Sequence, residues 1–80
     1  MTDVITNKPL RVTVIGTARP YIELAFSQLE TVRKLLDAQA VPYWVDDMVI
    51  SFNGGPEMAI IHLAWKANPA TVQAILDGIQ

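Results

Sequence analysis

His62 is the residue best suited to acid–base chemistry, since it is the only histidine in the chain and an imidazole can exchange a proton near neutral pH. It lies in the apolar run 59–65, which supplies no serine, cysteine or carboxylate to orient or polarise the ring. We therefore expect a structural or interfacial histidine and no catalytic residue. A small enzyme that uses His62 with an arginine and an aspartate is the alternative.

Asp46 and Asp47 are adjacent carboxylates in an extended stretch. Neighbouring residues of a strand point to opposite faces, so these two side chains would not reach one metal ion or one substrate. The chain also has no cysteine and a single histidine, which excludes thiol chemistry and disfavours zinc. We expect no metal and no cofactor.

Arg19 and the two tryptophans point to binding rather than catalysis. Arg19 precedes Pro20, where a helix is predicted to start, and free N–H groups at a helix start can hold an anion. Trp44 and Trp65 favour an interface, because tryptophan is enriched at the energetic centres of binding surfaces.

The composition indicates one small domain that buries part of its surface against another chain. Eighty residues make a single domain, 1–80. A hydrophobic fraction of 51% is high for this length, since small domains have more surface per residue. The net charge of −2 and scattered cations argue against nucleic acid. No apolar run spans a bilayer and no signal peptide is evident, so we expect a cytoplasmic protein.

Hydrophobic periodicity and capping signals predict five elements. Alternating and continuous apolar runs predict strands, and apolar residues at helical spacing predict helices. An Asn-Pro pair begins the last helix and a glycine ends it. The predicted elements are a strand over Leu10–Gly16, a helix over Tyr21–Gln39, an extended stretch over Tyr43–Phe52, a strand over Met58–Trp65 and a helix over Pro69–Gly78.

This order predicts an α/β fold of the ferredoxin-like β-α-β-β-α type, without the usual last strand. Two helices would cover one face of a mixed sheet of three or four strands, with the third strand between the first two. One edge of the first strand would be free to attract a partner. Residues 1–8 would be either a flexible arm or an extra strand at that edge.

The face without helices should carry the candidate interface residues. If Ile61, Leu63 and Trp65 face the helices, alternation places the other set on the open face; in the reverse register Trp65 moves to it. The residues that we expect on or near this face are Arg11, Trp44, Met58, Ile60 and His62.

The run Leu35–Asp47 resembles the helix-to-strand junction of small prokaryotic signal-transducing modules with ACT-like folds. The resemblance implies a regulatory or ligand-sensing module. It carries over no binding residue.

Arg19-Pro20-Tyr21-Ile22 and Val41-Pro42-Tyr43, with the pair Gly54-Gly55, resemble glutaredoxin segments. This resemblance implies a truncated thioredoxin-like fold as the alternative architecture. Both cysteines of that family are absent, so its thiol chemistry is excluded.

These observations favour a non-catalytic interaction or regulatory module that forms a homodimer or higher oligomer through its sheet face or its free strand edge. The alternative is an ACT-like sensor with a small-molecule site at the oligomer interface. A protein partner is a further expectation; nucleic acid and membranes are not expected partners.

Overall fold

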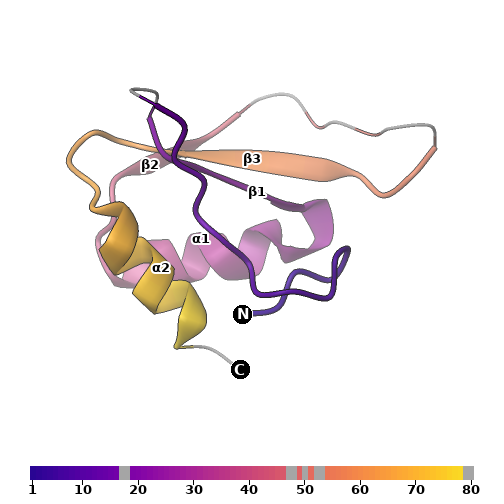
Figure 1. Ribbon diagram of the computed structural model, residues 1–80, viewed down its shortest axis with the longest axis horizontal. Helices are drawn as coiled ribbons and strands as arrows, with labels where there is room; N and C mark the ends of the chain where they lie inside the picture. Colours follow the sequence, from indigo (N-terminus) through magenta and orange to yellow (C-terminus); the bar gives the residue numbers. More distant parts are fainter. Residues whose placement is uncertain (17–18, 47–48, 50, 52–53, 79–80) are drawn as a thin grey trace.

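A sheet packed against two helices forms the body of the molecule (Figure 1). The computed structural model describes residues 1–16, 19–46, 49, 51 and 54–78. Its elements are β1 (Tyr21–Ala25), the 3-10 turn η1 (Phe26–Gln28), α1 (Leu29–Ala38), β2 (Tyr43–Val45), β3 (Met58–Leu63) and α2 (Pro69–Asp77).

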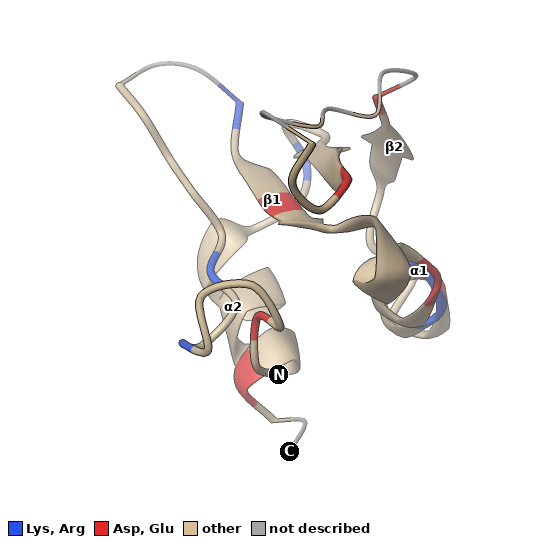
Figure 2. Ribbon diagram, turned by 90° about the vertical axis from the view of Figure 1, so that its right-hand side faces the viewer, with Lys and Arg blue, Asp and Glu red and all other residues tan. Residues whose placement is uncertain are grey.

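The sheet of the described residues has three strands in the order β1-β3-β2, and each pairing is antiparallel. Both helices lie on the same face (Figures 1 and 2). The expected small α/β domain with two helices on an open sheet is therefore present. β3 lies between the other two strands, and both of its pairings are antiparallel, so the sheet of the described residues is antiparallel and not mixed as expected.

Strict alternation along β3 positions the core. Ala59, Ile61 and Leu63 are buried, whereas the residues between them are only half-buried. One face of the strand thus meets the helices and the other does not. The side chains that share the core with β3 are Leu10, Ile22, Leu24, Val32, Leu36, Ala67, Val72 and Leu76.

The first strand is not where the sequence predicts it. Segment 10–16 forms a single bridge, between Thr13 and Tyr21, and turns at Gly16 with φ of +54°. The strand is instead Tyr21–Ala25, which was predicted as the start of a helix. Ile22 and Leu24 are both fully buried with an exposed residue between them, so a two-residue period sets the structure here.

The other predicted elements are present with shorter bounds. The first helix begins at Leu29 rather than Tyr21, β2 covers only part of 43–52, and β3 ends before Trp65. The second helix begins as expected: Asn68 Oδ1 accepts hydrogen bonds from the N–H groups of Ala70 (2.9 Å) and Thr71 (3.3 Å). The sequence of 43–52 is also consistent with a bend or a hairpin turn at Asp46-Asp47, and this feature lies partly outside the described residues.

Residues 1–10 form neither a free arm nor an edge strand. Thr2 bridges Pro9, which closes a loop against η1. The buried amide of Gln28 holds that loop: its Oε1 accepts from the Val4 N–H (3.1 Å) and its Nε2 donates to the Thr2 carbonyl (2.7 Å). The loop is therefore held against the rest of the molecule and forms part of its surface beside β1. Neither helix of the described chain has the length and apolar character needed to cross a membrane.

Candidate functional site

The open face of the sheet, opposite the helices, carries a row of rings. The register pairs His62 of β3 with Tyr21 of β1 on one side and with Trp44 of β2 on the other. Directly paired residues of an antiparallel sheet project on the same face. Tyr21, His62 and Trp44 thus cross all three strands, and Ile60 and Met58 follow them along β3.

Trp44 and His62 are in direct contact. Their ring centroids lie 5.3 Å apart with an interplanar angle of 21°, a stacked arrangement. The Trp44 side chain is nevertheless 42% exposed. A ring that is fixed on one side and accessible on the other is suited to contact a partner.

His62 also has a carboxylate partner, which the sequence analysis missed. Its Nε2 lies 3.0 Å from Asp46 Oδ2, and both side chains are about one-third exposed. The N–H of Asp46 donates to the Ile60 carbonyl (2.9 Å), which continues the pairing of β2 with β3. Asp46 therefore shares a face with Trp44, two positions away, and reaches the imidazole diagonally across the strands.

Arg19 joins the two tryptophans. Its Cζ lies 5.1 Å from the ring centroid of Trp44 and 5.4 Å from that of Trp65, distances typical of cation–π contacts. The predicted helix start beside Arg19 is wrong, since a strand begins after Pro20, so the free N–H groups that would help to hold an anion there are absent. The guanidinium instead fixes the exposed Trp65 at the edge of the open face.

Only some of the remaining predicted site residues lie on the open face. Met58 and Ile60 are half-buried on the open face, in the expected register. Trp65 follows the end of β3 and is 65% exposed, so it does not face the helices. Arg11 is exposed on the 10–16 segment and belongs to no strand of the sheet.

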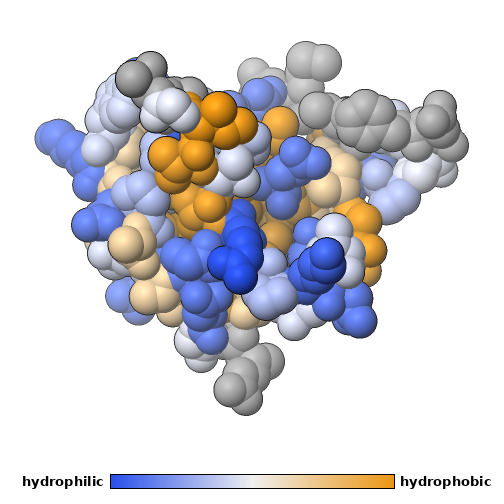
Figure 3. Space-filling model, viewed as in Figure 1, coloured by the Kyte–Doolittle hydropathy of each residue, from blue (hydrophilic) through white to orange (hydrophobic). Residues whose placement is uncertain are grey.

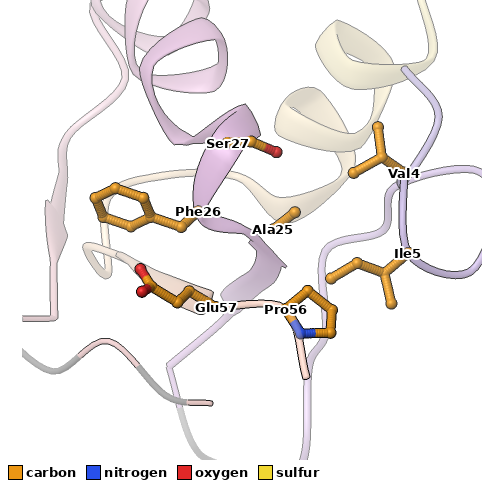
Figure 4. A pocket seen from close by; sticks show the side chains of 7 residues that line it. All are labelled: Val4, Ile5, Ala25, Phe26, Ser27, Pro56 and Glu57. Atoms are coloured by element: carbon orange, nitrogen blue, oxygen red, sulfur yellow. The ribbon is translucent and has the colours of Figure 1, made fainter. Parts of the chain in front are cut away.

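A groove lies at the opposite end of the sheet, where β1 ends and β3 begins (Figure 4). It has a volume of about 740 Å³ and is lined by Val4, Ile5, Ala25, Phe26, Ser27, Pro56 and Glu57. A smaller groove of about 300 Å³ adjoins it and adds Asp3, Thr6, Glu23 and Met58. This site could not be predicted from the sequence, because its outer wall is the N-terminal loop, which shows no periodic pattern of apolar residues.

Charged residues are unevenly placed along the sheet. Arg19 lies just before β1 begins, whereas Glu23 in the middle of that strand lines the grooves together with Asp3 and Glu57. In the described part of the chain, no three histidine or carboxylate side chains come close enough to hold a metal ion.

Large apolar side chains are common on the surface. Figure 3 shows an apolar patch beside the tip of the segment that leads into β1. The exposed large hydrophobic residues are Val4, Ile5, Val14, Ile15, Phe26, Trp44, Val49 and Trp65. Contiguous groups of such residues are candidate binding surfaces, whereas single exposed apolar residues are common on any protein.

No protein family, curated protein or solved structure matches this chain.

Proposed function

We propose that this protein is a non-catalytic interaction module, and that two copies associate by packing their open sheet faces together. The observation that carries the proposal is the row Tyr21–His62–Trp44, which lies on a face that neither helix covers. Aromatic rings held on a rigid sheet supply large contact area and lose little entropy on binding.

The charges on the open face support a second copy as the occupant. Arg19 lies two residues before β1, and Glu23 projects from the middle of that strand. A two-fold axis that runs across the strands, in the plane of the interface, places Arg19 of each copy near Glu23 of the other. This arrangement is self-complementary, as a two-fold interface requires.

The strand order also supports a ferredoxin-like fold that lacks its last strand. In that fold the central antiparallel strand separates the first two, as β3 separates β1 and β2. The missing strand would lie beside β1, where the described residues place only the Thr13–Tyr21 bridge. An ACT-like sensor with a ligand at the oligomer interface is a variant of the same proposal.

Light scattering coupled to size exclusion tests the proposal. We expect a mass of twice 8.8 kDa at concentrations of about 10 μM and above, since a well-packed aromatic interface gives micromolar or tighter binding. A mass of 8.8 kDa at about 10–50 μM, a concentration above a micromolar dissociation constant, would contradict face-to-face association.

The contact between His62 and Asp46 favours acid–base catalysis as a second candidate function. An aspartate that orients an imidazole is a recurrent arrangement in hydrolytic sites. If the protein is such a catalyst, we expect it to hydrolyse 4-nitrophenyl acetate faster than free imidazole does at equal concentration. We expect His62→Gln to lower that rate by about 10²-fold or more. A rate equal to that of imidazole would exclude this candidate.

A further inference from the structure

We propose a second mode of association, beyond the two-fold packing of open faces: copies of the chain join end to end. In this mode the turn that carries Trp65 and Lys66 on one copy docks into the groove beside Phe26 on the next. The proposal rests on the groove, on the exposed turn and on their places at opposite ends of the sheet.

The groove is apolar in its walls and acidic at its rim. Val4, Ile5 and Phe26 are exposed by 63%, 39% and 46%, although each lines a space between three segments of the chain (Figure 4). Glu57 lines the same space, and Asp3 and Glu23 line the adjoining groove. The lining of the two grooves contains no lysine or arginine among the described residues. A segment with an apolar side chain beside a cation would complement this site.

The turn after β3 offers that chemistry. Among the described residues Trp65 is the most exposed large hydrophobic side chain, at 65%, and Lys66 next to it is also exposed. The Arg19 guanidinium lies over the Trp65 ring, so the indole is held in place before binding and two cations flank it. A pre-ordered aromatic anchor loses less freedom when it enters a pocket.

The topology prevents the Trp65 turn from reaching the groove of its own molecule. Trp65 follows the end of β3, whereas the groove is built where β3 begins (Figure 1). The strand itself separates the two surfaces, so the turn of one molecule reaches only the groove of another. Contacts between two different surfaces are heterologous and extend into a chain or ring.

The contact is small, with one anchor side chain, so we expect a dissociation constant on the order of 0.1–1 mM. Amide chemical shifts detect this range. The experiment uses the full chain with Ile60→Lys, which separates this contact from face-to-face packing. In that background Trp65→Ala removes the anchor but keeps the groove, and Ile5→Lys places a cation in the groove but keeps the anchor.

Unlabelled Ile5→Lys protein is titrated into ¹⁵N-labelled Trp65→Ala protein, and amide shifts are followed. We expect saturable shifts that are confined to the lining of the grooves and that include Val4, Phe26 and Glu57. The matched control adds unlabelled Trp65→Ala protein, which has no anchor and is expected to leave these amides unchanged. Phe26→Ala replaces Ile5→Lys if the latter fails to fold.

Absent groove shifts, or equal shifts in the control, would overturn the end-to-end contact. Neither result bears on face-to-face association, which is tested by the mass of the unmodified chain. Shifts confined to the open face in both titrations would likewise overturn the proposal, since they would report residual face packing.

Discussion

Replacing Ile60 with lysine is expected to give a folded protein that is monomeric at micromolar concentration. Ile60 lies on the open face and is only half-buried in the single chain, so a lysine there can extend its ammonium group to water. Its neighbours across the strands are Glu23, with which it pairs, and Asp46, whose carboxylates favour a cation. In a face-to-face dimer the same ammonium would lose its water.

The burial of that charge should cost several kcal/mol of association free energy, which raises the dissociation constant by about 10²-fold or more. Light scattering at about 10 μM measures the mass, and circular dichroism measures the melting temperature. The end-to-end contact is too weak to be populated at this concentration.

Ile61→Lys is the matched control. Ile61 is fully buried against the helices, so a lysine there has no path to water and should unfold the protein. If Ile60→Lys instead keeps the dimer mass and melting temperature of the unmodified chain, the open face is not the interface. If it unfolds as Ile61→Lys does, the two faces of β3 have been assigned wrongly.

Part of this fold could be predicted because the signals were local. The strand over Met58–Leu63 combines β-branched and apolar residues bounded by a turn signal and by Asn68-Pro69, and the Asn68 side chain caps the next helix as expected. Alternation along that strand then placed Ile60 and His62 together on the open face. These inferences needed only the chain within a few residues of each position.

The region 10–28 could not be predicted, because its apolar residues fit two periods. Ile22, Ala25, Phe26 and Leu29 follow a helical spacing, whereas Ile22 and Leu24 follow that of a strand. The strand forms because β3 offers a full antiparallel partner from Met58 to His62. That partner is more than thirty residues away, and tertiary pairing overrides a local pattern.

The candidate site could also be predicted only in part, because some of its contacts depend on residues far apart in the sequence. Trp44 and His62 were expected on one surface, and they stack. The contact of His62 with Asp46 depends on the register of β2 against β3, which the sequence does not show. The groove depends on Gln28, whose amide fixes the N-terminal loop through two hydrogen bonds; an amide carries no periodic signal.

Leu24→Ala is expected to lower the free energy of unfolding by about 2–5 kcal/mol, because it empties a fully packed position. Leu24 has no exposed surface and projects from β1 into the core beneath the sheet. Phe26→Ala is the matched comparison, since Phe26 is larger but 46% exposed. Its replacement is expected to cost about 1 kcal/mol or less.

Urea unfolding followed by circular dichroism measures both variants under the same conditions. The order of the two effects distinguishes the strand from a helix over 21–39. In such a helix Phe26 would lie on the apolar stripe with Ile22 and Leu29, and Leu24 would lie off it, so Phe26→Ala would be the more damaging change. That reversed order would contradict β1, and with it the aromatic row that begins at Tyr21. The expected order would also show that the Phe26 ring contributes little to stability, which agrees with its proposed place in a binding groove.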